Sequence, residues 1–321
     1  MSDPIMLTAD DGHAIAIYHW PATAPARGVV HWLHGMAEHG ARYARLAEAL
    51  NAAGWHLVAH DHRGHGASVA EEADRGHYAD DNGWEKVIGD TAAVVGWINA
   101  RIPDMPVVMA GHSMGSFIAL DMAERHGDNF LGLVLCGSNY HSGLFYRVMR
   151  LPALIERWRL GGRGISKLIH SLSFGAFAKK IPDAATEFDW LSRDPEEVAK
   201  YMADPWCGHD CTVQMWIDLI NALIRMHRGR NMARLPASLP VLLIAGDSDP
   251  MSNFGRGVPA LFRKLHKAGV KALSLCEYAG GRHEILNDRC RDEVTEDLLE
   301  WLQALPMQSA EAPELASSTT A

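Results

Sequence analysis

Cysteine is scarce in this 321-residue chain, which contains five: Cys136, Cys207, Cys211, Cys276 and Cys290. An odd number without the spacing of a disulfide framework indicates free thiols and a reducing compartment. The sequence also lacks any apolar run near the roughly 20 residues of a membrane-spanning helix. Its first residues lack the basic and apolar regions of a secretory signal. We therefore expect a cytoplasmic protein.

An excess of basic residues is absent as well. The chain has 30 Lys and Arg against 39 Asp and Glu, a net charge of −9, whereas proteins that bind nucleic acid generally tend to be basic. We expect no nucleic-acid partner. Hydrophobic residues make up 48% of the chain, which is sufficient for one large core, or for a core domain with an inserted subdomain.

Apolar strands and helical segments alternate along most of the chain. An Asp-Gly turn between residues 6–9 and 14–18 predicts a β-hairpin at the start. Further strands are predicted at 29–33, 55–59, 106–110, 131–136, 240–245 and 272–277. Helices are predicted at 43–53, 84–101, 114–126, 254–268 and 288–305. This alternation predicts an α/β fold, with a mostly parallel central sheet and helices on both of its faces.

The alternation stops between residues 139 and 238, where the pattern indicates helices and loops without a comparable strand. A hundred residues is too long for a structureless loop, so this segment is expected to be an inserted helical cap. The core domain then consists of residues 1–138 and 239–305. Residues 306–321, rich in Ser, Thr, Ala and Glu, are expected to form a disordered tail.

The segment Gly111-His112-Ser113-Met114-Gly115 has the G-x-S-x-G pattern, between a predicted strand and a predicted helix. In that context the serine occupies a strained turn with its hydroxyl exposed, which is typical of a nucleophile. The flanking glycines fit a turn too tight for side chains. Ser113 is therefore the candidate nucleophile, and the amide of Met114 is a candidate donor to an oxyanion.

A serine nucleophile needs a base and an acid that orients the base. In a parallel sheet, functional loops follow the carboxyl ends of the strands. Asp249 follows the strand predicted at 240–245, and His283 follows the strand at 272–277. The order Ser, Asp, His is complete with these two residues. Asp247 is nearer to its strand and is the alternative acid.

The second oxyanion amide is expected from the loop after the strand at 29–33. Gly35 allows close approach of the backbone there, so the N–H of Met36 is the candidate donor beside that of Met114. His34 is expected to brace this loop. Chemistry of this kind requires no metal and no organic cofactor.

Two segments contain residue types that also bind metals. They are His60-Asp61-His62-Arg63-Gly64-His65 and Cys207-Gly208-His209-Asp210-Cys211. The first lacks a regular ligand spacing and fits a tight turn, and the second is one cysteine pair without another. Neither segment predicts a zinc site, and the cysteines are expected to be plain thiols.

Further motifs accompany the serine turn: His34–Tyr43 (HGMAEHGARY), Asp61–Ser68 (DHRGHGAS) and Gly246–Asp249 (GDSD). Together they resemble the α/β-hydrolase superfamily and, more narrowly, the monoacylglycerol lipase and bacterial lysophospholipase group of serine hydrolases. The resemblance extends over about residues 5–303. It implies ester hydrolysis of a single-acyl lipid. It also implies a nucleophile, its acid and base, and two oxyanion amides: Ser113, Asp249, His283, Met36 and Met114.

Other functions on the same fold remain open from the sequence: a thioesterase, an aminopeptidase or a C–C bond hydrolase. A small-molecule receptor without turnover is the alternative outside the enzymes. An aminopeptidase would need acidic cap residues that hold the substrate amine. The candidates for that role are Glu156, Glu187, Glu196 and Glu197.

The predicted cap is basic, with 14 Lys and Arg against 10 Asp and Glu, a net charge of +4 in a chain of −9. Between Leu144 and Lys167, arginines alternate with large apolar residues. Such a segment can rest on an anionic membrane surface, which would make the protein a peripheral membrane protein. The alternative is a helix that turns its apolar face to the core and its basic face to solvent.

Overall fold

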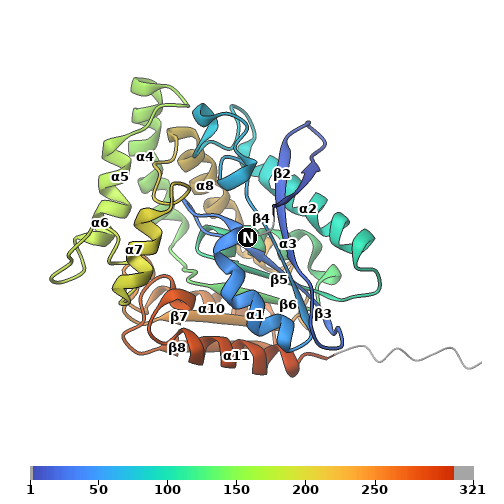
Figure 1. The fold of residues 1–321 in the computed structure, drawn as a ribbon. Helices are drawn as coiled ribbons and strands as arrows, with labels where there is room; N and C mark the ends of the chain where they lie inside the picture. Colours follow the sequence, from blue (N-terminus) through green and yellow to red (C-terminus); the bar gives the residue numbers. More distant parts are fainter. Residues whose placement is uncertain (1–2, 307–321) are drawn as a thin grey trace, which may run out of the picture.

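The computed structural model describes residues 3–306, with an eight-stranded sheet at their centre (Figure 1). The strands are β1 (Ile5–Thr8), β2 (Ala14–Trp20), β3 (Gly28–Leu33), β4 (Trp55–His60), β5 (Val107–His112), β6 (Gly132–Cys136), β7 (Val241–Gly246) and β8 (Leu273–Tyr278). Their order is β1-β2-β4-β3-β5-β6-β7-β8. The strands β3 to β8 run parallel, whereas β2 is antiparallel to both β1 and β4. The predicted α/β architecture with a mostly parallel sheet is confirmed.

Helices cover both faces of the sheet. The first face packs against α1 (Ala44–Ala52) and α11 (Arg291–Gln303), and the second against α2 (Gly83–Arg101), α3 (Met114–His126) and α10 (Gly257–Ala268). Successive residues of β5 alternate between the two cores: Val108 packs on the side of α1, and Met109 on the side of α3. Because both faces are covered, the inner strands β3 to β7 are almost entirely buried and mostly apolar, whereas the edge strand β8 is partly exposed.

Two helix starts differ from the sequence prediction. Helix α10 begins at Gly257 and not at residue 254, because Asn253 and Phe254 adopt positive φ values of 56° and 54°, which a right-handed helix excludes. Helix α11 begins at Arg291 and not at residue 288. The carboxylate of Asp288 instead accepts hydrogen bonds from the backbone amides of Arg193 and Arg282.

Between β6 and β7 the described chain forms a group of helices over one end of the sheet (Figure 1). They are α4 (Gly143–Leu160), α5 (Lys167–Leu172), α6 (Phe174–Ala178), α7 (Pro195–Ala203), α8 (Val213–Met226) and α9 (Gly229–Met232). The apolar side of α8, with Met215, Leu219 and Leu223, belongs to the same core as α2 and α3. Helix α8 therefore anchors this group on the sheet domain, and α4 packs on its outer side.

Short 3₁₀ turns complete the described structure, at Gly40–Tyr43, Gly66–Ser68, Glu72–Asp74, Gly127–Asn129 and Ile285–Asn287. None of the helices in residues 3–306 is at once long and apolar enough to cross a membrane. The tail predicted to be disordered lies, from residue 307 onward, outside the described residues.

Candidate active site

Ser113 is the single residue between the end of β5 and the start of α3. Its φ of 52° and ψ of −118° are rare for a residue with a side chain, and such strain costs about 1–3 kcal/mol. The neighbouring glycines are required by packing. A Cβ atom on Gly111 would overlap the carbonyl of Gly115, and one on Gly115 would overlap the carbonyl of Leu33. The tight turn thus holds the Ser113 hydroxyl above the sheet.

His283 and Asp249 lie beside this serine, as their positions after β8 and β7 predict. The Nε2 atom of His283 is 2.9 Å from Oγ of Ser113, and Nδ1 is 3.0 Å from Oδ2 of Asp249. Asp249 is fully buried, and its other oxygen accepts a hydrogen bond of 2.8 Å from the amide of Met251. With the proton of Nδ1 donated to the carboxylate, Nε2 is free to accept the serine proton.

Asp247 does not reach His283. Its carboxylate accepts hydrogen bonds from the amide of Gly280 at 2.7 Å and from the hydroxyl of Ser248 at 3.0 Å. It therefore joins the turn after β7 to the turn after β8. Of the two acids considered from the sequence, only Asp249 faces the imidazole.

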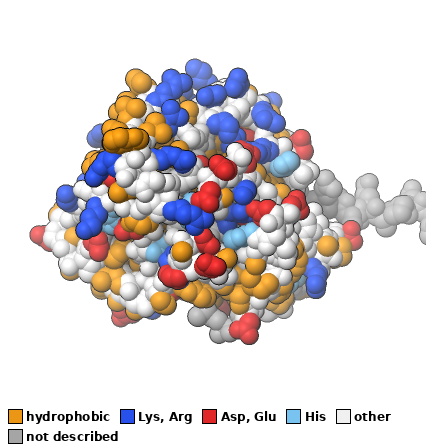
Figure 2. All heavy atoms as spheres, turned by 90° about the horizontal axis from the view of Figure 1, so that it is seen from above, with side chains coloured by type: hydrophobic (Ala, Val, Ile, Leu, Met, Phe, Trp, Pro, Cys, Tyr) orange, Lys and Arg blue, Asp and Glu red, His pale blue; other side chains and the backbone are white. Residues whose placement is uncertain are grey.

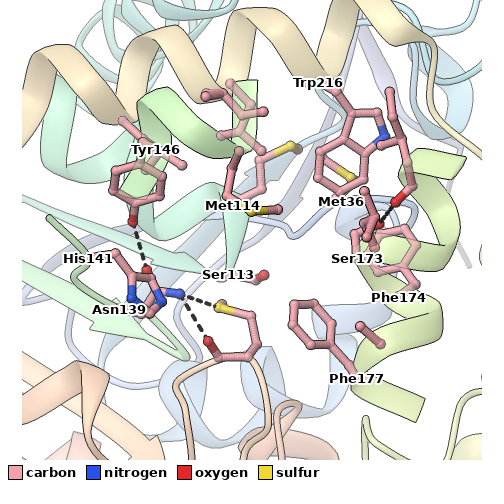
Figure 3. Close-up of a pocket in the computed structure, with 18 of the residues that line it drawn as sticks. Met36, Ser113, Met114, Asn139, His141, Tyr146, Ser173, Phe174, Phe177 and Trp216 are labelled. Atoms are coloured by element: carbon pink, nitrogen blue, oxygen red, sulfur yellow. Dashed lines mark hydrogen bonds between the residues drawn. The ribbon is translucent and has the colours of Figure 1, made fainter. Parts of the chain in front are cut away.

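Met36 and Met114 line the same cavity as Ser113 (Figure 3). Within residues 3–306, neither backbone amide has a hydrogen-bond acceptor. Met114 is the first residue of α3, where the helix dipole favours negative charge. The loop after β3, which carries Met36, is braced by His34. Nδ1 of His34 donates to the carbonyl of Gly35 at 2.7 Å.

A buried carboxylate fixes the loop that carries Met36. Oε1 of Glu38 accepts hydrogen bonds from the amide of Gly35 at 2.5 Å and from the hydroxyl of Tyr43 at 2.9 Å. Oε2 accepts from Arg42 at 2.6 Å, and Arg42 also makes a bidentate pair with Glu284, which follows His283 in the chain. This network thereby connects the Met36 loop to the histidine loop.

His112 joins the same network from the end of β5. Its Nδ1 is 3.1 Å from Oε1 of Glu38, and its Nε2 is 3.2 Å from the carbonyl oxygen of His283. Both partners are acceptors, an arrangement that favours the protonated ring, in which both nitrogens donate. Burial disfavours this charge, but Glu38 outweighs burial and raises the pKa of His112 above 6.5. The sequence analysis did not predict the pairing of Glu38 with His112, although both residues lie within motifs that it identified.

The Glu38–His112 pair predicts a pH-dependent stability. Glu38→Gln removes the buried carboxylate that pairs with both Arg42 and His112. We expect the unfolding free energy to fall by about 3–5 kcal/mol, because their positive charges lose this buried partner. Because folding raises the pKa of His112, the stabilisation by this proton is full below pH 6.5 and is lost as pH rises through the folded value. Urea unfolding across this range should show a deficit in Glu38→Gln that shrinks at alkaline pH.

Glu72→Gln is the matched control, because Glu72 also pairs with an arginine, Arg75, but is exposed. Exposed pairs contribute little to stability, so its unfolding free energy should stay close to that of the unmodified protein. A Glu38→Gln variant that also unfolds like the unmodified protein at every pH would contradict the role of the network.

The serine opens into a cavity of about 520 Å³ that the helices α4, α6 and α8 help to enclose. This size lies within the range of small-molecule sites, roughly 300–1,000 Å³. Most of the lining is apolar or aromatic, as Figure 3 shows for Phe174, Phe177 and Trp216 around Ser113. Polar and basic side chains are interspersed among the described lining residues: Asn139, His141, Tyr146, Ser173, Lys180 and Asn253.

No acidic side chain is among the described residues that line this cavity. Of the glutamates that could hold a substrate amine, Glu156 bonds to Ser166 and Arg159, and Glu197 bonds to Arg45 and Lys200. Glu187 and Glu196 also lie outside the lining. The described lining of this cavity therefore offers no carboxylate to an amine. Two glutamates, Glu38 and Glu284, line a smaller pocket that also contacts Ser113, but both are paired with Arg42.

Lipases and esterases are among the known proteins with similar sequences and structures. The family described as serine aminopeptidase, S33, matches residues 24–290. The monoacylglycerol lipase of Mycolicibacterium smegmatis is 31% identical over 88% of this chain and 90% of that protein. Human monoglyceride lipase is 29% identical over 85% of this chain and 80% of that protein.

Among solved structures, a carboxyl esterase from Bacillus coagulans in complex with glycerol superposes with a TM-score of 0.85 and 29% identity, over 94% of this chain and 98% of that chain. The family match covers most of the sheet domain and all the helices between β6 and β7. The resemblance to the monoacylglycerol lipase group is thus confirmed, and the chain belongs to the serine aminopeptidase S33 family of α/β-hydrolases.

Proposed function

We propose that this protein is a serine hydrolase that cleaves the carboxylic ester of single-acyl lipids, of the monoacylglycerol or lysophospholipid type. The observation that carries the proposal is the hydrogen-bonded chain of Ser113, His283 and Asp249 at the floor of a largely apolar cavity. Its relatives named monoacylglycerol lipase and phospholipase support the substrate class.

In this mechanism Ser113 attacks the ester carbonyl while Nε2 of His283 accepts its proton. The amides of Met36 and Met114 donate to the oxyanion that forms. Collapse of the intermediate expels the alcohol, which takes the proton from His283, and leaves an acyl-enzyme. Water then attacks the acyl group with His283 as base, and the fatty acid is released.

The cavity lining favours an acyl-chain substrate over the amine-bearing substrate of an aminopeptidase. An apolar wall suits an acyl chain, because removing apolar surface from water is favourable by about 25 cal/mol per Å². Lys180 is the lining side chain with a fixed charge, and it repels the protonated amine of an aminopeptidase substrate. The site thus matches a neutral or anionic lipid ester better than a peptide.

A panel of substrates tests the function. We expect turnover of monoacylglycerols or lysophospholipids to exceed, in kcat/KM, that of aminoacyl p-nitroanilides and acyl thioesters. A preference for the aminoacyl amides would contradict the proposal and favour an aminopeptidase. Absence of turnover for every ester, including short p-nitrophenyl esters, would favour a receptor.

We also propose that α4 brings the protein to an anionic membrane surface. Its outer face carries exposed Leu144, Val148, Leu151, Ile155 and Trp158, spaced by three or four residues and 55–87% exposed. This spacing forms one continuous apolar stripe along the helix. Exposed stripes of this kind mark interaction surfaces.

Arginines flank the stripe and complement anionic headgroups. Arg147 and Arg157 lie exposed on the same helix. Figure 2 shows hydrophobic side chains gathered beside Lys and Arg on the face seen from above. The inner side of α4, at Met149 and Pro152, lines the cavity. A lipid that leaves the bilayer at α4 would thus be next to the cavity wall.

Vesicle sedimentation tests the membrane contact. Leu151→Ser with Trp158→Ser should reduce binding to anionic vesicles at every salt concentration, because apolar contact is lost. Arg147→Gln with Arg157→Gln should reduce it mainly at low salt, by about 1 kcal/mol per cation. Met202→Ser, an exposed apolar change on α7, is the control that should bind normally.

Hydrolysis of a short soluble ester should be the same in all these variants. If the apolar double variant binds vesicles as tightly as the unmodified protein, α4 is not the membrane contact.

A further inference from the structure

Two segments that do not predict a metal site separately lie together in the structure. His65 belongs to the loop after β4, and His209 and Cys211 belong to the loop between α7 and α8. One ring nitrogen of each histidine and Sγ of the cysteine all lie within 4.8 Å of one another. In tetrahedral zinc sites the bonds are about 2.0–2.3 Å, which places ligand atoms roughly 3–4 Å apart. Small side-chain adjustments would bring these three atoms onto one ion.

His65 is oriented as metal-binding histidines usually are. Its Nδ1 lies 3.2 Å from the carbonyl oxygen of Arg63, so this nitrogen carries the proton. Its Nε2 is fully buried and has no hydrogen-bond partner among the described residues. Metal-ligating histidines commonly donate their second N–H to a carbonyl in this way, and an unpaired buried acceptor is costly without a ligand.

The side chains of His209 and Cys211 are also buried at the atoms that could bind a metal. Both ring nitrogens of His209 are buried without a partner within residues 3–306. With neither nitrogen engaged in a hydrogen bond among these residues, a neutral imidazole at this position has a lone pair available to a metal ion. Cys211 is buried as well. Arg75 is a positive charge close to His209 and would repel a metal ion, but it is paired with Glu72 at 2.6 Å.

We propose that His65, His209 and Cys211 bind a zinc ion, with water as the fourth ligand. On binding, the thiol of Cys211 loses its proton to solvent and the thiolate forms the Zn–S bond, while both histidines bind as neutral imidazoles. The ion would tie the α7–α8 loop to the loop after β4. The ring of His65 is 5.2 Å from that of His34, so this bond would also stiffen the support of the Met36 loop.

In a second cluster nearby, formed by His39, Asp204 and Cys207, two of the three side chains are already paired with each other. Nε2 of His39 is paired with Asp204 at 2.9 Å, and Asp204 also accepts from the amide of Trp206. Its third member, Cys207, is therefore the matched control for Cys211. Cys290, which is only partly buried, is a control for binding by a solitary thiol.

The experiment measures metal binding directly and does not depend on enzymatic activity. The full chain is stripped with a chelator, incubated with Zn²⁺ or Co²⁺, desalted and analysed for bound metal. We expect one ion per chain, a thiolate-to-cobalt charge-transfer band and a higher melting temperature with Zn²⁺. Cys211→Ala and His209→Gln should each lose all three, whereas Cys207→Ala and Cys290→Ala should keep them.

Two results would overturn the site: an unmodified protein that binds no more zinc than Cys211→Ala, or binding that is lost with Cys207→Ala and kept with Cys211→Ala. Circular dichroism of each metal-free variant separates lost binding from lost folding. His209 is partly exposed, so His209→Gln provides a second variant if Cys211→Ala does not fold. The outcome is independent of ester hydrolysis.

Discussion

Ser113→Ala should abolish ester hydrolysis and labelling by a fluorophosphonate. The hydroxyl forms the covalent intermediate, and no neighbouring group can replace it. Removing the nucleophile of a serine protease lowers kcat by roughly 10⁶-fold, and we expect a loss of that order here. Steady-state assays with a p-nitrophenyl ester and gel detection of a fluorescent fluorophosphonate measure the two effects.

The fold should survive this change. Alanine has the same backbone requirements as serine, and the turn is held by the packing of Gly111 and Gly115, so the melting temperature should not change. Ser173→Ala is the control, because Ser173 lines the same cavity but its hydroxyl donates to the carbonyl of Ile169. Labelling should persist in that variant. Labelling that also persisted in Ser113→Ala would place the nucleophile elsewhere.

The sheet was predictable because its strands are buried on both sides. Continuous apolar runs such as residues 131–136 and 240–245 have no polar face that could be confused with a surface strand. The loops after β7 and β8 were predictable as functional for a topological reason, since the carboxyl ends of parallel strands share one edge. For this reason Ser113, Asp249 and His283 could be predicted to lie together, although they are far apart in the sequence.

The network beneath the site was not predictable in the same way. Glu38 contacts His112 across 74 positions, and Arg42 contacts Glu284 across 242. No local pattern distinguishes a buried glutamate of this kind from an exposed one on a loop. Its role becomes visible only when the folded chain leaves the carboxylate without access to water.

The direction in which the apolar face of α4 points could not be predicted from the sequence either. A spacing of three and four residues indicates that apolar side chains share a face, but not which way that face points. The structure turns Leu144, Leu151 and Trp158 outward because α8 already closes the core beneath α4. The cluster of His65, His209 and Cys211 has the same origin, since it forms only when the α7–α8 loop packs beside the loop after β4.

Asp249→Asn should lower kcat by roughly 10²–10⁴-fold, with little change in stability. The asparagine amide can donate toward Nδ1 of His283, which favours the tautomer with its proton on Nε2. That nitrogen then cannot accept the proton of Ser113, although the three side chains remain in contact. The hydrogen bond from the amide of Met251 to the second oxygen is retained, so the turn itself should be preserved.

Asp247→Asn is the matched comparison on the same turn, two residues away. Its side-chain oxygen can still accept from the amide of Gly280, and it has no contact with His283 among the described residues. We therefore expect kcat within a few-fold of the unmodified enzyme, measured with the same p-nitrophenyl ester. If Asp247→Asn were instead the more damaging change, Asp247 would be the acid that orients the base. The hydrogen bond between Asp249 and His283 would then be structural, and the assignment of the acid would have to be exchanged.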